Sequence, residues 1–376
     1  MQLYQQQDIG NVVWQDSAEH KMLAAFLKNG ARHYIHNTDC QLSLLVDKNL
    51  YLPIVIPHVD YPNSYVCSPY GQYVDYGYKE VDIELSERPW ANKLSKGAIK
   101  LFEKCAPRKY FDKVVFVNNW LLSTNLYTDI SIQQLKDITD LLVSKYPDRA
   151  IVFRSVGDML NHQLLSDLEY LNYDKVLSRQ IYILDPKLGV YKKKKAYKDD
   201  LRLQRKRTDY QWVSSKDCTS DVWKRVKRFY DDLYLRKYSI LNPQFSNAFF
   251  RDSIQEKWLN YHFLQKDGEV HACIAYFHRN GIMTTPILGY NFDLPKTEGF
   301  YRLDSLKIIQ EGVQNNLIIH NSSGAAKYKK HRGAVPSSEY NLVYTKHLSR
   351  ARKFPWKLLQ GMTKHIATPI LNRYEL

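Results

Sequence analysis

Residues 151–157 read Ile-Val-Phe-Arg-Ser-Val-Gly, and residues 318–324 read Ile-Ile-His-Asn-Ser-Ser-Gly. Each stretch is a short apolar run that ends in polar residues and a glycine, which is the pattern of a buried strand followed by a turn. Each follows an amphipathic helical pattern and precedes a shorter helical one. The two stretches share this order of features and little residue identity. They predict an internal repeat, with one copy of the same unit in each half of the chain.

The second half predicts an ordered series of elements around its copy. Asn280-Gly281 marks a hairpin turn there, because both residues tolerate positive φ. Thr219 or Ser220 is available as the N-cap of the first helix. From hydrophobic spacing, the expected elements are a helix at 219–235, a short helix at 246–255, strands at 258–266, 269–278 and 282–288, an amphipathic helix carrying Leu303, Leu306, Ile309 and Val313, a strand at 317–320, a short helix at 324–331 and a strand at 339–345.

The first half predicts nearly the same series. Asp16 is the expected cap of its first helix, and Ser131 with Gln134 forms a capping box that opens its long helix. The expected elements are a helix at 16–28, strands at 41–47 and 50–56, the long helix from 131, a buried strand at 150–153, a helix at 160–171 and a strand at 177–184. Both halves therefore follow one order of helices and strands.

The 376 residues are enough for two ordinary domains. We predict an α/β fold of the α+β type, with two tandem domains at 1–190 and 191–376, each a mixed, mainly antiparallel sheet flanked by helices. The boundary falls between 185 and 210. The first domain carries an insertion at about 57–112, read as a loop whose tyrosines either line a binding cleft or cover the core. These tyrosines are Tyr61, Tyr65, Tyr70, Tyr73, Tyr76 and Tyr78.

The net charge of +15 is concentrated in two segments. Residues 187–207 hold ten Lys or Arg against two Asp, and residues 327–357 hold nine against one Glu, so the rest of the chain is about neutral. The first segment is expected to be a basic linker and the second a basic C-terminal segment. Two such segments indicate an anionic partner, either cofactor phosphates, RNA or a membrane surface. The alternative is a solvated surface that keeps the protein in solution.

The composition also limits the cellular compartment and the kinds of site that we expect. No apolar run approaches the roughly 20 residues that span a bilayer, and the N-terminus lacks the pattern of a secretion signal. The five cysteines are scattered, and no pair has metal-site spacing. We expect a cytoplasmic protein without a metal site, with peripheral contact at the inner face of the membrane as a further expectation. No oligomeric state follows from the sequence.

Three short motifs of the second half resemble those of a known family. They are Gly289-Tyr290 after a strand, Gly299-Phe300-Tyr301-Arg302-Leu303 at the start of a helix, and Ser323-Gly324-Ala325-Ala326-Lys327-Tyr328-Lys329 after the buried strand. With its order of elements, the half resembles the GNAT (acetyltransferase-type) core, and two such units resemble the FemAB-like family. In the first half, Ser68-Pro69-Tyr70-Gly71 and Ser178-Arg179-Gln180 are similar to stretches of bacterial GNAT-like proteins.

This resemblance implies an N-acyltransferase that moves an acyl or aminoacyl group to an amine of a cell-envelope or metabolite precursor, either a small molecule or lipid-linked. It implies no permanently bound cofactor and a donor that is acyl-CoA, an acyl-carrier protein or aminoacyl-tRNA. Both halves lack the Gln/Arg-x-x-Gly-x-Gly/Ala loop that holds the pyrophosphate of acyl-CoA in GNAT enzymes. The donor therefore stays open, and the basic segments suit a bulky anionic donor.

Amide formation from an activated ester needs an oxyanion stabiliser, a neutral amine and a proton for the leaving group. The predicted catalytic residues near a helix start, which offer a cation and a hydroxyl, are Lys327, Tyr328 and Lys329. Tyr290, just after a strand, is a further predicted catalytic residue, as a general acid. The predicted substrate-binding residues are Arg154, Arg179, Arg302, Tyr70 and Tyr73, and those for the donor phosphate are Arg205, Ser323 and Gly324. Each group has a structural alternative: surface positions for 327–329, a surface ion pair for Arg302 and buried pairing for Arg154 and Arg179.

Two other functions remain open at this stage. A non-catalytic GNAT-like protein would use its basic segments to hold RNA, with an affinity that falls steeply with salt. A peripheral membrane protein would use the C-terminal segment instead, inserting Phe354, Trp356, Leu358 and Leu359.

Overall fold

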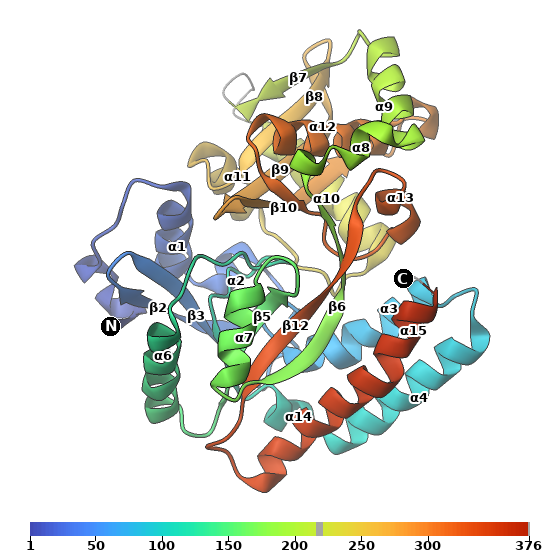
Figure 1. Ribbon diagram of the computed structural model, residues 1–376. Coiled ribbons are helices and arrows are strands. Elements are labelled where there is room, and N and C mark those ends of the chain that lie inside the picture. The colour runs from blue at the N-terminus through green and yellow to red at the C-terminus, as the bar shows by residue number, and fades with distance from the viewer. Residues whose placement is uncertain (216–220, 375–376) are drawn as a thin grey trace.

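The computed structural model describes residues 1–215 and 221–374. Within these residues twelve strands form one continuous sheet in the order β1-β2-β3-β4-β5-β12-β6-β11-β10-β9-β8-β7 (Figure 1). The pairs β4–β5 and β10–β11 are parallel, and the other pairs are antiparallel. The predicted α/β class with mainly antiparallel pairing is confirmed, and the two expected sheets are joined into one. The strands are β1 Gln2–Gln5, β2 Cys40–Asp47, β3 Leu50–Pro57, β4 Val114–Val117, β5 Ala150–Gly157, β6 Asp174–Leu184, β7 Gln211–Ser214, β8 Asn260–Lys266, β9 Glu269–Arg279, β10 Ile282–Tyr290, β11 Ile318–His320 and β12 Val335–Tyr344.

The internal repeat is visible in the register of the two parallel pairs. Ile151 of β5 lies opposite Val115 of β4, and Ile318 of β11 lies opposite Ile282 of β10. Four residues further along, Ser155 and Ser322 both adopt left-handed backbone conformations, with φ of 65° and 57°. Few residues other than glycine enter that region. The stretches 151–157 and 318–324 therefore hold equivalent places in the two halves.

The last strand of each half pairs with the other half. β12 lies beside β5, β6 lies beside β11, and β6 and β12 pair with each other at the centre of the sheet. Figure 1 shows this exchange as the green strand β6 and the red strand β12 crossing the middle of the molecule side by side. Because each half completes the sheet of the other, side chains of both halves meet there.

Helices cover both faces of the sheet. In the second half, α12 packs on one face of β9 and β10, and α10 packs on the other face; α12 lies in front of the sheet in Figure 1. The helices are α1 Ala18–Asn29, α2 Ala31–Tyr34, α3 Tyr76–Glu84, α4 Pro89–Cys105, α5 Arg108–Phe111, α6 Ile132–Lys145, α7 His162–Tyr170, α8 Val190–Lys193, α9 Lys195–Lys206, α10 Val222–Tyr230, α11 Asn247–Gln255, α12 Phe300–Gln314, α13 Ala326–Lys330, α14 Arg350–Met362 and α15 Thr368–Tyr374.

Most of the predicted elements are present, and the local signals explain their ends. α6 begins with the predicted capping box, in which Ser131 Oγ accepts a hydrogen bond from Gln134 N–H at 3.2 Å. Asn280 and Gly281 both have positive φ in the turn between β9 and β10. The predicted cap of α1 is wrong, because Ser17 Oγ rather than Asp16 accepts from His20 N–H. The predicted caps at 219 and 220 lie outside the described residues.

The insertion differs from the predicted loop, because it is largely helical. A π-helical turn at Gly71–Asp75 continues directly into α3, and α4 follows with Pro89 in its first turn, where the missing N–H costs nothing. The first basic segment is likewise helical, as α8 and α9. α14, a π-helical turn at Thr363–Ala367 and α15 follow β12 and pack beside α3 and α4 at the lower right of Figure 1.

Candidate active site

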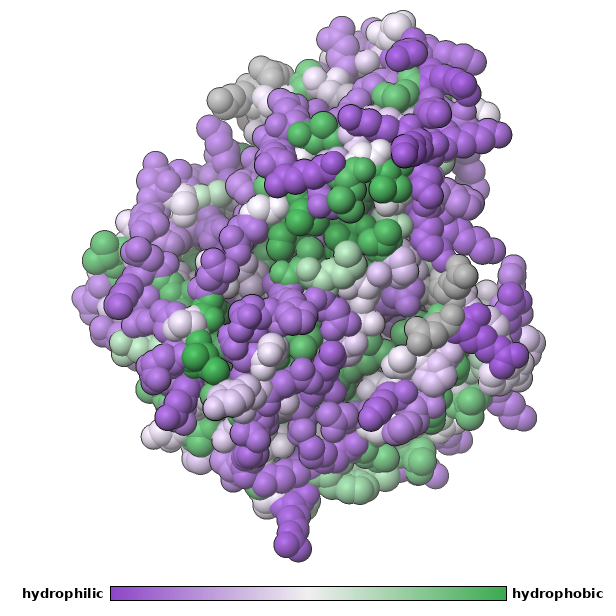
Figure 2. All heavy atoms as spheres, viewed as in Figure 1, coloured by the Kyte–Doolittle hydropathy of each residue, from purple (hydrophilic) through white to green (hydrophobic). Residues whose placement is uncertain are grey.

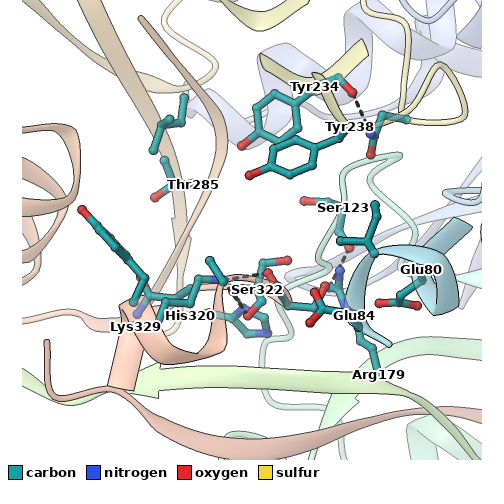
Figure 3. A pocket seen from close by; sticks show the side chains of 18 of the residues that line it. Glu80, Glu84, Ser123, Arg179, Tyr234, Tyr238, Thr285, His320, Ser322 and Lys329 are labelled. Carbon is teal, nitrogen blue, oxygen red and sulfur yellow. Dashed lines mark hydrogen bonds between the residues drawn. The ribbon is translucent and has the colours of Figure 1, made fainter. Parts of the chain in front are cut away.

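A cavity of about 430 Å³ opens where β10 and β11 separate (Figure 3). The two strands pair only over Ile282–Thr284 and Ile318–His320, although β10 continues to Tyr290. After His320 the chain turns toward β6, where Asn321 N–H donates to Tyr182 O at 2.9 Å. Among the described residues, no strand pairs with this edge of β10 beyond Thr284. The cavity therefore borders a stretch of β10 that has no partner strand on this side, and Thr285 and Leu288 of that stretch line it.

Both faces of the sheet contribute to the lining of this cavity. Leu233, Tyr234 and Tyr238 come from the π-helical turn that continues α10 on one face. Tyr301 and Ser305 come from α12 on the other face. The insertion adds α3 as a further wall, so the cavity passes through the gap between the strands and includes elements of both halves.

Lys329 extends into the cavity from α13 (Figure 3). Its Nζ donates to the carbonyl oxygens of Ser323 at 2.7 Å and Ser322 at 3.3 Å. Burial and the nearby charge of Arg179 lower the pKa of Lys329 to about 7, against the opposing effect of Glu84. An amine with this pKa exchanges its proton readily near neutral pH, so it can donate one or accept one during a reaction.

Two carboxylates of α3, Glu80 and Glu84, face the same cavity (Figure 3). Burial raises the pKa of Glu80 to about 7, although the Arg179 guanidinium opposes the shift. Burial also raises the pKa of Glu84, against the charge of Lys329. Within the described part of the chain, neither carboxylate is held by an ion pair or a hydrogen bond. These side chains can therefore bind a cationic group or take up a proton.

A buried network joins the three central strands beside this cavity. Arg179 of β6 donates from Nε to Glu339 of β12 at 2.8 Å. His320 of β11 lies 3.2 Å from the other carboxylate oxygen, and its Nδ1 accepts from Ser322 N–H at 3.1 Å. That acceptor role assigns the proton to Nε2, which donates to Glu339. Burial raises the pKa of Glu339, but Arg179 and His320 overcome this and hold it at about 2. The network therefore keeps Glu339 ionised, so its charge at the floor of the cavity does not change near neutral pH.

Tyr73 and Tyr328 also line the cavity, and other side chains hold their hydroxyls. Tyr73 OH accepts from Asn341 Nδ2 at 2.9 Å. Tyr328 OH donates to Ser305 Oγ at 3.0 Å, and burial raises its pKa to about 12. Arg332 lies 3.5 Å from the centre of the Tyr328 ring. These tyrosines supply fixed neutral hydroxyls near neutral pH.

The structure places the remaining predicted site residues in two groups. Arg154, Arg179, Ser323 and Gly324 line the cavity together with Tyr73, Tyr328 and Lys329. The others lie outside its lining. Lys327 and Arg205 are exposed, and Arg302 pairs with Asp200 at 2.7 Å. Tyr290 stacks on Phe292, and the Tyr70 hydroxyl donates to Glu103 while the Arg108 guanidinium lies over the Tyr70 ring.

Sequence reasoning did not single out Glu80, Glu84, His320 or Glu339. A signal for the first two was present, because Tyr73, Gly77, Glu80 and Glu84 are spaced as one face of a helix. The tyrosines and glycines of the insertion favoured a loop and concealed that spacing. No local signal marks Glu339, since its partners come from β6 and β11 and are brought to it by strand pairing.

The two basic segments do not form two continuous surfaces. On α8 and α9 the exposed cations are Lys192, Lys193, Lys195, Lys198, Arg202, Arg205 and Lys206. Asp200 on the same helix is buried and binds both Arg302 and Arg332, which fixes α9 against α12 and the cavity wall. The C-terminal segment is divided instead, with Lys329 and Arg332 in the cavity lining and the others spread along the chain to α14.

The four apolar residues expected to insert into a membrane are divided as well. Trp356 and Leu359 are buried, Trp356 against Phe111 with 4.3 Å between ring centroids, while Phe354 is exposed. No helix in the described ranges is long and apolar enough to cross a bilayer. No group of three His, Cys, Asp or Glu side chains in those ranges could hold a metal ion.

Comparison with known proteins gives likenesses of structure only. No family model matches the sequence, and no curated protein matches it. Solved structures similar to the chain include the C-terminal domain of a putative lysylphosphatidylglycerol synthetase from Agrobacterium fabrum, with 10% identity over 93% of this chain and 92% of that one and a TM-score of 0.49. Another is FemX, with 7% identity, coverage of 83% and 89%, and a TM-score of 0.49.

A tandem GNAT protein from the clavulanic acid biosynthesis pathway is also similar, with 8% identity, coverage of 86% and 87%, and a TM-score of 0.38. The predicted resemblance to FemAB-like and tandem GNAT proteins is thus found among solved structures. At these identities the likeness concerns the fold alone.

Proposed function

We propose that this chain is an N-acyltransferase that joins an acyl or aminoacyl group to an amine within the cavity between β10 and β11. The observation that supports this most is the pair of groups that face the gap from opposite halves. Lys329 and Glu80 both have a pKa of about 7, one offering an amine and the other a carboxylate. Groups whose pKa lies near the working pH can both donate and accept protons.

The acceptor amine arrives as an ammonium ion and must lose a proton before it can attack. The carboxylates of Glu80 and Glu84 line the cavity without an ion pair among the described residues, so they can attract this cation and take its proton. Glu80 is the better base near neutral pH, because burial has raised its pKa to about 7. The neutral nitrogen then attacks the carbonyl carbon of the donor.

The attack forms the C–N bond and places a negative charge on the carbonyl oxygen. Lys329 and the backbone N–H groups of β10 beyond Thr284, apart from Pro286, which has none, are the candidate donors that stabilise this oxyanion. Collapse of the intermediate breaks the C–S or C–O bond to the carrier. A proton from the Lys329 ammonium neutralises the leaving thiolate or alkoxide. The attacking nitrogen gives up its second proton to the neutral Lys329 amine, which restores the ammonium, and the proton held by Glu80 returns to solvent, so protons and charge balance.

The donor is carried on a bulky anion in this proposal. The exposed cations of α8 and α9 lie next to the cavity, since Asp200 ties α9 to the cavity-lining Arg332. A charged tRNA, an acyl-carrier protein or the phosphates of acyl-CoA would each be attracted to that surface. The acceptor is the amine of a small or lipid-linked precursor. We expect the reaction in the cytoplasm, with contact at the inner membrane face when the amine is lipid-linked.

The test offers the purified protein each class of donor (acyl-CoA, acyl-carrier protein, aminoacyl-tRNA) with a panel of amines and detects amide products by mass spectrometry. Lys329→Met keeps the length of the side chain and removes its amine. We expect this variant to lose about 10²–10⁴-fold of the rate, which is the usual size of a general acid–base contribution. Lys346→Met is the matched control, because that lysine is exposed beyond the end of β12.

Failure of every donor and acceptor, or equal rates for Lys329→Met and the control, would refute the proposal. If transfer is absent while RNA binds with a steep dependence on salt, the non-catalytic alternative is supported instead. That alternative predicts that the logarithm of affinity falls linearly with the logarithm of salt concentration, with a slope set by the number of phosphate contacts.

A further inference from the structure

A second cavity, of about 200 Å³, lies among the helices beside the candidate active site. α3 and α4 of the insertion, α14, the turn Thr363–Ala367 and α15 surround it; the close grouping of α3, α4, α14 and α15 is visible at the lower right of Figure 1. Ile99, Phe102, Leu359 and Ile366 are among the apolar side chains in its wall. Ala98 of α4 and Ala367 of the turn leave room in it, because both side chains are small.

This apolar cavity adjoins the active-site cavity, because the two share part of their walls. Gly77, Glu80 and Glu84 of α3 line both, as do Arg179 of β6 and the loop 323–324. Gly324 has a φ of +74°, a conformation that favours glycine, and it lies beside Glu84 on the wall that the two cavities share. Charged side chains line the shared wall and the active-site cavity, and apolar side chains line most of the second cavity.

Figure 2 shows the outer surface of the molecule, where hydrophilic side chains cover most of the visible face. The hydrophobic area near the centre of that view lies above the position of α3, α4, α14 and α15 in Figure 1. Protein interiors are normally close-packed, and an apolar space lined by Leu, Ile and Phe does not hold water well. A cavity of this kind next to a reaction site is suited to an apolar part of the substrate.

We propose that the apolar cavity holds an aliphatic chain of the substrate, so that the enzyme acts on an amphiphile. This inference rests on the proposed function and specifies its substrate class. The polar head of the amphiphile lies among Glu80, Glu84 and Lys329, and its chain passes Gly324 to end between α4 and α15. The chain belongs either to the acyl donor or to the amine acceptor, and both place the same aliphatic group in the same cavity.

Binding is tested without catalysis, by displacing a fluorescent C18 polyene fatty acid from the full-length protein. The competitors are saturated carboxylates and n-alkylamines with chains from C4 to C16. We expect affinity to rise about fourfold for each added methylene until the cavity is filled, because each buried CH₂ contributes a similar free energy. Ala98→Trp, which fills the apolar cavity, is expected to weaken binding of the C12 competitors at least about tenfold.

Gly97→Trp is the matched control, because Gly97 is the neighbouring exposed residue of α4 and a Cβ there meets no atom within 4 Å. If Ala98→Trp fails to fold, Ala367→Phe fills the cavity from the opposite element. Equal affinities for C4 and C12 competitors would overturn the inference, as would C12 binding that both filling variants leave unchanged.

Transfer assays then identify the molecule that carries the chain. One arm varies the acyl thioester from acetyl to hexadecanoyl with a short amine, and the other varies the amine with an acetyl donor. A rate that increases with chain length in one arm, and loses this dependence in Ala98→Trp, supports the inference and assigns the chain. Chain binding without transfer in any arm would refute the proposed function alone. Transfer that is independent of chain length, together with no chain binding, would refute this inference alone.

Discussion

The two halves of the molecule differ at the same place in their sheets, where the pairing of the two parallel strands ends. In the second half, β10 and β11 separate after Thr284, and the cavity lies where they separate. In the first half, the equivalent position follows Val117 of β4, where residues 118–126 fold into the opening. Arg154 adds its guanidinium from β5, donating to the carbonyl oxygens of Leu122 and Ser123 at 3.2 Å each.

The filling of the first-half opening is irregular backbone that is almost wholly buried, and asparagine side chains satisfy it. Asn118 Nδ2 donates to Leu126 O at 3.0 Å, and Asn119 Nδ2 donates to Val66 O at 2.8 Å. Asn125 Oδ1 accepts from Trp120 N–H at 3.1 Å. Buried backbone needs such partners. The comparison shows that one copy of the repeat fills the opening beside its parallel strands, while the other copy leaves it open as the cavity. We call the first the scaffold half.

The scaffold half still contributes to the open site. Its insertion provides α3 with Glu80 and Glu84, and its last strand provides Arg179. The exchange of β6 and β12 brings Arg179 of β6 to the second-half gap. The candidate active site is therefore composite, with the gap and Lys329 from one half and the carboxylates from the other. Changes in the first-half opening should affect stability, and changes in the second-half opening should affect transfer.

The largest effect is expected from removing the filling of the first-half opening. Trp120 is buried, packs 5.2 Å from the Phe277 ring, and donates from Nε1 to Asn118 Oδ1 at 2.9 Å. Trp120→Ala leaves a void and removes one of the two hydrogen bonds that Asn118 Oδ1 accepts, the other coming from Arg279. The substitution should lower the free energy of unfolding by about 3–5 kcal/mol. Urea denaturation measures this loss. The rate of transfer per folded molecule should be unchanged, and a specific loss of rate in the folded variant would contradict the division of roles.

Filling the second-half opening should give the reverse result. Thr285 follows the last paired residue of β10 and lines the cavity (Figure 3). Thr285→Trp should lower the rate of transfer by roughly 10²-fold, because misplacing the reacting groups by about 1 Å costs that much. Stability should change little, since the added ring occupies existing space. Thr208→Trp, in the exposed turn before β7, is the control. Unchanged transfer in Thr285→Trp would mean that the reaction takes place elsewhere.

Local signals in the sequence predicted much of the fold. The capping box at Ser131, the Asn280-Gly281 turn and the two apolar stretches depend on neighbouring residues only, and each gave the right element. The equivalence of 151–157 and 318–324 extends to the left-handed serines. The exchange of β6 and β12 was beyond such reasoning, because it depends on pairing between strands that are far apart in the chain.

The candidate site could be predicted only in part, for the same reason. The segment after Gly324 was recognised, and it contributes Tyr328 and Lys329 to the cavity. Lys327 and Lys329 lie on one five-residue helix, and only packing decides that Lys329 points inward while Lys327 is exposed. Glu80 was hidden in an insertion that read as a loop. Its relation to Lys329 exists only once the two halves are joined.

The smallest effect concerns the dependence of stability on pH. The groups that titrate near neutral pH belong to the open gap, whereas the first-half opening holds Arg154, whose guanidinium stays charged. Burial raises the pKa of Glu80 from an ordinary 4.5 to about 7. Between these values the unfolded chain has lost the proton that the folded protein keeps, so stability falls as pH rises from about 4.5 to about 7.

Glu80→Gln should remove this fall in stability. We expect the fall to be below about 1 kcal/mol, because solvent screens the partly exposed side chain. Urea denaturation at about pH 5 and about pH 7.5 measures it, with the exposed Glu87→Gln as control. If Glu80→Gln and Glu87→Gln show the same dependence on pH, Glu80 is not the group that titrates in the gap, and Glu84 takes its place as the candidate base.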